Sequence, residues 1–125
     1  TALTMYRSPY HSFWNDNPES EATRAQYAQR IDRFRNLAGE GKPTLFVRAV
    51  ATTDELSSAE ELLAVLLGKF GSQAKLLLIV DFQESSYGPC TVEGCPGLLV
   101  HFLHGTAHSG DSRDAPYREP ITAAL

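Results

Sequence analysis

The fold of this chain is decided by the stretch Pro43-Thr44-Leu45-Phe46-Val47-Arg48-Ala49-Val50 and by the segments on either side of it. Its side chains alternate in a way that predicts a strand. An amphipathic helix is expected before it over 19–38, and a leucine-rich helix after it over 59–70. The apolar run at 75–80 then predicts a second strand. Because the order is strand, helix, strand, we expect two parallel strands joined by a right-handed crossover.

Both expected helices have recognisable boundaries in the sequence. Apolar side chains recur at helical spacing along the first helix, at Ala28, Ile31, Phe34 and Leu37. Gly39 and Gly41 then favour its termination. The second helix is expected to begin with the capping box Ser58-Ala59-Glu60-Glu61, in which the serine hydroxyl caps the backbone and the glutamate reaches back to it.

A third strand is expected over 98–103, where the chain is again apolar. The residues before it, 83–97, are rich in serine, glycine and proline and predict a loop. We therefore expect an α/β fold over 19–104, with a small, mainly parallel three-stranded sheet and two main helices. Residues 1–18 are expected to form an irregular, aromatic N-terminal arm, and residues 105–125 an irregular, extended C-terminal tail.

The second expected strand is apolar at every position from Leu76 to Val80, which is typical of a strand covered on both faces. Two helices have enough apolar surface to cover one face of a three-stranded sheet. The second face then needs cover either from the arm and the tail of the same chain or from another chain. This requirement is the main physical reason to expect a subunit of a larger assembly.

The composition is that of an ordinary globular protein, with 125 residues of which 42% are hydrophobic and 21% charged. A net charge of -4 at pH 7 opposes a nucleic-acid-binding role that depends on neutralising phosphates. No apolar run approaches the ~20 residues needed to cross a bilayer. The glycines form neither a G-x-G-x-x-G loop nor a P-loop, so a nucleotide-binding protein ranks last and no cofactor is expected.

Two cysteines and two histidines are the candidates for chemistry: Cys90, Cys95, His101 and His104. Either cysteine could act as a nucleophile with one of the histidines as its base, in a cysteine-dependent hydrolase. The cysteines could instead form a disulfide that closes the loop, or remain free thiols. Zinc is the least favoured interpretation, because the spacing matches no finger pattern and the two histidines would point to opposite faces of a strand. No metal site is therefore expected.

Two further sets of residues are expected to bind a partner or to stabilise the fold. Aromatic side chains crowd the N-terminal arm, at Tyr6, Tyr10, Phe13 and Trp14. They predict either cover for this domain or an interface with another protein. Arg48 lies inside an otherwise apolar strand and needs an edge position or an acidic partner. Asp81, at the end of the next strand, is its predicted partner in a structural ion pair.

Two stretches of the sequence carry a resemblance to a known family. They are Tyr27-Ala28-Gln29-Arg30-Ile31-Asp32-Arg33-Phe34 and Lys42-Pro43-Thr44-Leu45-Phe46-Val47-Arg48. Together with the acidic pair Asp54-Glu55, the leucine-rich helix and the second strand, they resemble a domain family described as papain-like cysteine peptidases. The similarity covers about residues 10–82.

In that family the nucleophilic cysteine lies in a segment before the first helix, and a histidine near an aspartate belongs to the pattern. His11 and Asp16 match the histidine and the aspartate loosely, with altered spacing. No cysteine of this chain precedes Cys90, so the resemblance implies the C-terminal part of such a domain without its nucleophile segment. It implies a scaffold without peptidase activity of its own.

The sequence thus favours a non-catalytic accessory or interaction subunit of a larger protein assembly, with a cysteine-dependent hydrolase as the alternative. The expected partners are other protein subunits, bound through the aromatic arm and the tail. The chain begins at Thr1 instead of methionine, which would fit a processed component of an organellar complex, including one attached peripherally to a membrane. The compartment itself is left open.

Overall fold

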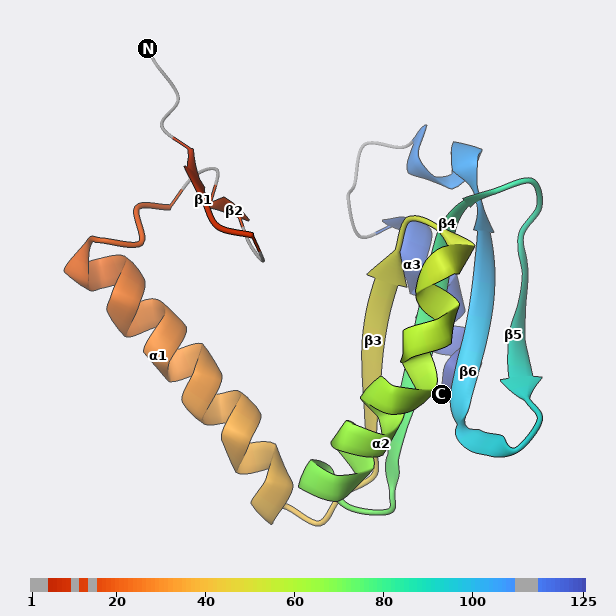
Figure 1. The fold of residues 1–125 in the computed structure, drawn as a ribbon, viewed down its shortest axis with the longest axis horizontal. Helices are drawn as coiled ribbons and strands as arrows, with labels where there is room; N and C mark the ends of the chain where they lie inside the picture. The colour runs from red at the N-terminus through yellow and green to blue at the C-terminus, as the bar shows by residue number, and fades with distance from the viewer. Residues whose placement is uncertain (1–4, 10–11, 14–15, 110–114) are drawn as a thin grey trace. The chain divides into compact units, whose positions relative to one another are not determined.

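The computed structural model describes residues 5–9, 12–13, 16–109 and 115–125. The chain forms two compact units, 1–40 and 41–125, and each is described by itself (Figure 1).

The first unit contains a short hairpin and one long helix. Strands β1 (Tyr6–Arg7) and β2 (Ser12–Phe13) pair antiparallel, and they are followed by helix α1 (Glu21–Asn36) and a short 3₁₀ helix (Leu37–Gly39). The predicted helix over 19–38 is therefore present as α1. Ser20 caps it, because its hydroxyl oxygen accepts a hydrogen bond of 3.2 Å from the backbone N–H of Thr23.

The second unit is a four-stranded sheet between two helices. Its strands are β3 (Thr44–Val50), β4 (Ala74–Gln83), β5 (Tyr87–Val92) and β6 (Cys95–His104), and its helices are α2 (Ala59–Phe70) and α3 (Ala115–Ala124). The strand order is β3-β4-β6-β5, and β3, β4 and β6 are parallel. The α/β class and the parallel strands are confirmed, while the expected sheet of three strands is wrong by one strand.

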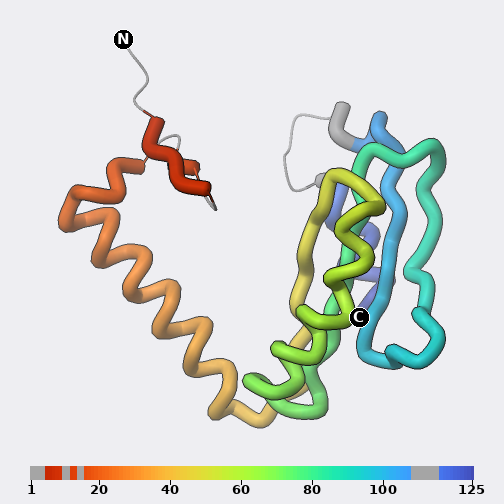
Figure 2. Tube along the Cα trace, in the orientation of Figure 1, coloured from red at the N-terminus to blue at the C-terminus, as the bar shows by residue number. Residues whose placement is uncertain are grey.

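The additional strand arises because the predicted loop over 83–97 contains β5, which pairs antiparallel with β6 (Figure 2). Half-buried Cys90 and Val92 alternate with exposed Thr91, as in a strand with one covered face. Gly94 provides the left-handed backbone of the two-residue turn, with φ of +77°. The density of glycine and proline in this segment predicts a loop, and long-range pairing with β6 outweighs that local signal.

The predicted extended tail over 105–125 is also corrected, since it ends in helix α3. Helices α2 and α3 lie on opposite faces of the sheet (Figure 1). On the α3 face, Leu77, Ile79 and Leu103 are buried, and they pack against partly buried side chains that include Tyr117, Ile121 and Ala124. The chain thereby supplies its own cover for the second face of the central strand.

Strand β4 forms the centre of the core. Leu76, Leu77, Leu78, Ile79 and Val80 are each at most 1% exposed, as expected for a strand covered on both faces. On the α2 side, the ring of Phe46 from β3 lies 4.8 Å from the ring of Phe70 at the end of α2. The neighbouring strands are therefore paired in a defined register with a central strand whose apolar residues are fully buried.

Candidate functional site

The cysteine and histidine candidates are distributed over both faces of the sheet. Cys90 on β5 pairs with Val100 on β6, and both line an apolar hollow of about 440 Å³ beside the start of α2. His101 follows Val100 along β6 and lines a different cavity, next to α3. Neighbouring residues of a strand point to opposite faces, so the Cys90 thiol and the His101 imidazole are separated by the sheet itself.

The other cysteine–histidine combinations are separated along the strands. Cys95 begins β6, whereas His101 and His104 lie near its end, roughly 20 and 30 Å away at about 3.3 Å per residue. His104 lies roughly 13 Å along β6 from the position opposite Cys90. A nucleophile and its base must be within hydrogen-bond reach, so none of the four pairings forms a catalytic dyad in this structure.

The two cysteines are free and partly buried. Cys90 lies opposite Val100, whereas Cys95 lies opposite Val92 at the hairpin turn, and no disulfide joins the two cysteines. Within the described ranges no three side chains of histidine, cysteine, aspartate or glutamate gather in a way that could hold a metal ion. In this structure both cysteines are therefore free thiols.

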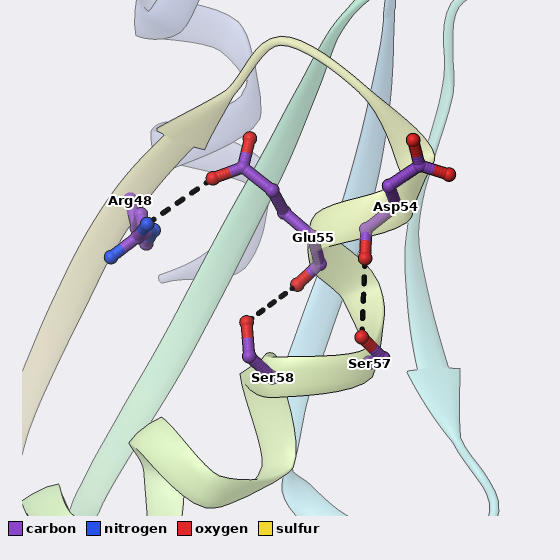
Figure 3. A network of polar contacts seen from close by, with 5 residues as sticks. All are labelled: Arg48, Asp54, Glu55, Ser57 and Ser58. Carbon is purple, nitrogen blue, oxygen red and sulfur yellow. Dashed lines mark hydrogen bonds and ion pairs between the residues drawn. The ribbon is translucent and has the colours of Figure 1, made fainter.

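Arg48 contacts a different acid from the one predicted by the sequence. Its guanidinium lies 3.3 Å from the carboxylate of Glu55, in the 3₁₀ segment Thr53–Ser58 that joins β3 to α2 (Figure 3). Arg48 is on the edge strand β3, where its side chain is 52% exposed. An exposed pair of this kind contributes about 0–1 kcal/mol to stability.

The expected capping box at the start of α2 does not form. The hydroxyl of Ser58 donates a hydrogen bond of 3.1 Å to the backbone carbonyl of Glu55 instead of capping α2 (Figure 3). The 3₁₀ segment runs directly into α2, and the N–H of Ala59 bonds to the carbonyl of Leu56. Backbone carbonyls of the preceding turn therefore occupy the place that the serine side chain would take.

Asp81, the predicted partner of Arg48, has a partner on α3. The hydroxyl of Tyr117 donates a hydrogen bond of 2.8 Å to the carboxylate of Asp81, which is only 4% exposed. Burial and the neighbouring carboxylate raise the pKa of Tyr117 to about 12, because both disfavour a phenolate at this place. The contact attaches α3 to the carboxyl end of the central strand.

The backbone is irregular just beyond Asp81. The register between β4 and β6 shifts between Val80 and Gln83, and Phe82 has a φ of 59°, in the left-handed region that residues other than glycine rarely adopt. Phe82 is also 62% exposed. Such bulges redirect side chains at strand ends, and the carboxyl ends of parallel strands are where α/β folds place ligands.

The clearest candidate site is a cavity of about 470 Å³ at this end of the sheet, on the α3 face. We call it the His101 pocket. It is formed by the β4–β5 connection, β5, β6, the 3₁₀ segment Gly105–Ser109 and α3. Its lining residues are Ser86, Tyr87, Gly88, His101, Leu103, Ala107, Pro116, Glu119 and Pro120.

His101 is the unusual member of this pocket. The side chain is 6% exposed, and its Nδ1 atom is buried without a hydrogen-bond partner in the part of the chain that the structure describes. Desolvation lowers the pKa of His101, and the negative charge of Glu119 opposes this effect with a smaller one in the other direction. Burial of this side chain therefore favours the neutral imidazole.

Gly88 permits the close approach of β5 to this histidine. A Cβ atom built on Gly88 would lie 3.0 Å from the backbone at His101 and Val100 and 3.1 Å from Nδ1 of His101. Its φ of +135° also belongs to the region that favours glycine. The backbone of the neighbouring strand β5 therefore covers Nδ1, in place of a polar side chain.

The sequence indicated His101, but for a role with a cysteine that it does not contact. It did not indicate Ser86, Gly88 or Glu119. Glu119 lies in the segment predicted as a tail, and only the docking of α3 brings it to His101. The importance of Gly88 can be recognised only once the pairing of β5 with β6 is known, because this pairing brings it next to His101.

The aromatic residues of the first unit are described in part. The Phe13 ring packs edge-on against the Tyr27 ring, with centroids 5.4 Å apart and an interplanar angle of 73°. The Arg30 guanidinium lies over the Tyr27 ring, 5.3 Å from its centroid. Tyr6 is half-buried, whereas Tyr10 and Trp14, also predicted as interface residues, and His11 lie outside the described residues.

Comparison with protein-family models, curated proteins and solved structures finds no match. The resemblance to papain-like domains therefore stays a prediction, and function has to be argued from geometry. In the described part of the chain, none of the helices has the length and apolar character needed to cross a membrane.

Proposed function

We propose that this chain is a non-catalytic interaction subunit of a larger protein assembly, and that it binds a protein partner through the apolar face of α1. The observation that carries this proposal is that α1, a helix of 16 residues, has no buried residue. Ile31 and Phe34 are 46% and 45% exposed, and they share one helix face with Tyr27.

The physical argument starts from how helices are stabilised. A helix of this length is marginal in isolation, and in proteins most of its stability comes from packing of an apolar face. Phe13 packs against Tyr27, near the start of that face. Complete burial of a large apolar side chain contributes about 1.5–3 kcal/mol, so Ile31 and Phe34 would gain substantially from contact with a partner.

The placement of the cysteines supports the non-catalytic part of the proposal. A cysteine-dependent hydrolase needs a thiol within hydrogen-bond reach of a base. Cys90 and His101 instead line separate cavities, on opposite faces of the sheet. This arrangement fits a papain-like scaffold that serves for interaction and not for catalysis. Its proposed partners are neighbouring protein subunits of an organellar complex.

The test is native mass spectrometry of the protein isolated from its source, with tagged variants expressed at native level. Wild-type chain is expected only in an assembly of higher mass. The double variant Ile31→Asp, Phe34→Asp should be released as a monomer, because two carboxylates would have to be desolvated in the interface.

Gln29→Asp is the matched control, since Gln29 is exposed on the opposite side of the same helix. This variant introduces an aspartate into the same helix, as the double variant does, but on the opposite face. It should therefore leave the assembly intact. A wild-type chain that is monomeric at its source would refute the proposal. It would also be refuted if the double variant lowered the melting temperature of the isolated chain, because the apolar face would then be covered within the monomer.

A further inference from the structure

The His101 pocket has no part in the proposed interaction, because it lies wholly within the second unit. It is nevertheless a site with a specific polar arrangement. A buried polar atom without a partner costs about 1–3 kcal/mol, and an apolar side chain at position 101 would avoid this cost. The presence of a histidine at this position therefore calls for an explanation beyond packing.

The position of Nδ1 determines which tautomer the ring adopts. An N–H group buried without an acceptor is tolerated less well than an unused lone pair. We therefore assign the proton of the neutral ring to Nε2 and the lone pair to Nδ1. Nδ1 has no exposed surface, so it is not the part of His101 that borders the pocket. We assign that position to the Nε2–H donor on the other side of the ring.

Glu119 supplies the complementary group. It is an exposed residue of α3 that lines the same pocket, and its charge acts on His101. The pocket thus combines one neutral donor with one anionic acceptor. Ser86 adds a hydroxyl whose oxygen accepts a hydrogen bond of 2.8 Å from the backbone N–H of His104. Among the described residues its own proton has no acceptor, so it can be donated to a ligand.

This combination discriminates among ligand charges. The carboxylate of Glu119 repels an anion. An ammonium group would satisfy Glu119, but its positive charge would face the Nε2–H donor of His101. A hydroxyl group both donates and accepts, so two adjacent hydroxyls can bond to Glu119 and His101 together.

The remaining walls suit the carbon skeleton of such a ligand. Leu103 of β6 lines the pocket, whereas the ring of Tyr87 is stacked on Phe102, with centroids 4.6 Å apart, and lies with it on the α2 side of the sheet. Pro116 and Pro120 of α3 contribute apolar surface to the lining. A volume of about 470 Å³ is within the usual range for small-molecule sites.

We infer that the His101 pocket binds a small, uncharged, hydroxyl-rich ligand of the sugar or polyol class, with His101 donating a hydrogen bond from Nε2 and Glu119 accepting one from a ligand hydroxyl. Pro116 and Pro120 of α3 pack against the carbon skeleton of the ligand. The site belongs to the second unit alone. The ligand inference can therefore fail while the proposed role of α1 stands, and the proposed role of α1 can fail while the ligand inference stands.

The experiment is NMR titration of the full-length chain, with the ring nitrogens of the histidines labelled with ¹⁵N. The probes are D-glucose, D-mannose, D-galactose and myo-inositol, with spermidine as the cationic probe and inorganic phosphate as the anionic probe. At least one of the hydroxyl-rich probes is expected to bind at millimolar concentration and to shift the Nε2 resonance of His101. Spermidine and phosphate should leave this resonance unchanged.

Two exposed, neighbouring positions on α3 provide the variant and its control. Glu119→Ala should weaken binding at least about tenfold, which corresponds to the loss of one good hydrogen bond to a charged group. Arg118→Ala should leave binding unchanged, since Arg118 does not line the pocket. Neither exposed side chain is part of the core, so both variants should fold.

Three results would overturn the inference. The first is the absence of a His101 shift with all four hydroxyl-rich probes. The second is a shift with spermidine or phosphate alone. The third is sugar or inositol binding that Glu119→Ala does not weaken, because the carboxylate would then have no part in recognition.

Discussion

The hydroxyl of Tyr117 on α3 donates a 2.8 Å hydrogen bond to the buried carboxylate of Asp81 at the end of β4. The two residues are 36 positions apart in the sequence. Their contact holds the last helix of the chain against the carboxyl end of the central strand. Because α3 also contributes Glu119 to the His101 pocket, the same contact supports the candidate site.

Removal of this hydrogen bond should destabilise the second unit. We expect Tyr117→Phe to lower the free energy of unfolding by about 1.5–3 kcal/mol, the range for a hydrogen bond to a charged group. Urea denaturation at neutral pH measures the change. Tyr87→Phe is the control, because the Tyr87 side chain is largely exposed and its loss of a hydroxyl should have little effect on stability. An equal effect of the two substitutions would contradict this account.

The same tyrosine should make stability sensitive to alkaline pH. Its pKa is raised from 10.0 to about 12 in the folded chain, so folding favours the neutral phenol. The corresponding stabilisation is complete below pH 10 and is lost as the pH rises from 10 to about 12. Urea midpoints across this interval should fall more steeply for the wild type than for Tyr117→Phe. Parallel pH profiles would show that Tyr117 is not the group responsible.

His101 should make the stability of the fold sensitive to acidic pH. Its pKa is lowered from 6.5 in the folded chain, so the unfolded state takes up a proton first as the pH falls. The stabilisation is present above pH 6.5 and is lost progressively below it. His101→Gln should flatten the stability profile between about pH 7 and pH 5.5, where carboxylates change little. Parallel stability profiles of the wild type and His101→Gln in this interval would show that His101 is not the group responsible.

Two glycine substitutions should have opposite signs. A Cβ at Gly88 would lie 3.0 Å from backbone atoms of β6, at a φ of +135°, so Gly88→Ala should destabilise by at least about 1–3 kcal/mol. Gly68 lies inside α2 with open space around a Cβ. Gly68→Ala should therefore stabilise by about 0.5–1 kcal/mol. Thermal and urea unfolding check both, and a neutral Gly88→Ala would disprove the close approach of β5 to His101.

The thiols provide a test of the cysteine arrangement. Titration with a thiol reagent after denaturation without reductant should count two free thiols per chain, from Cys90 and Cys95. In the native protein neither should react selectively, because neither His101 nor His104 lies within reach of either thiol. Reductant should not change the melting temperature. A single fast-reacting cysteine at neutral pH would favour the hydrolase alternative.

The parallel strands and both main helices follow from local patterns. Leu76 to Val80 are apolar without interruption, and this property alone indicates a strand covered on both faces. The periodicity of α1 and the leucines of α2 likewise act over a few residues. Strand β5 was not predictable in this way, because its glycines and prolines favour a loop and its partner residues on β6 lie further along the chain.

The candidate site was predictable to a smaller extent. His101 was recognised as chemically notable from its residue type, but its neighbours Gly88 and Glu119 were not. Glu119 reaches the pocket only because α3 docks on the sheet. Because side chains alternate between the two faces along β6, His101 points to the face opposite Cys90, although the two residues are close in the hairpin.

What the sequence by itself determined is the α/β class, the order of the main elements and the buried central strand, because hydrophobic periodicity is a local property of the chain. The tertiary structure alone decided that the chain covers both faces of its sheet, that Asp81 bonds to Tyr117, and that His101 faces Glu119 instead of a cysteine. Each of these depends on contacts between distant segments. Such contacts are set by strand register and by helix docking, which no short stretch of sequence encodes.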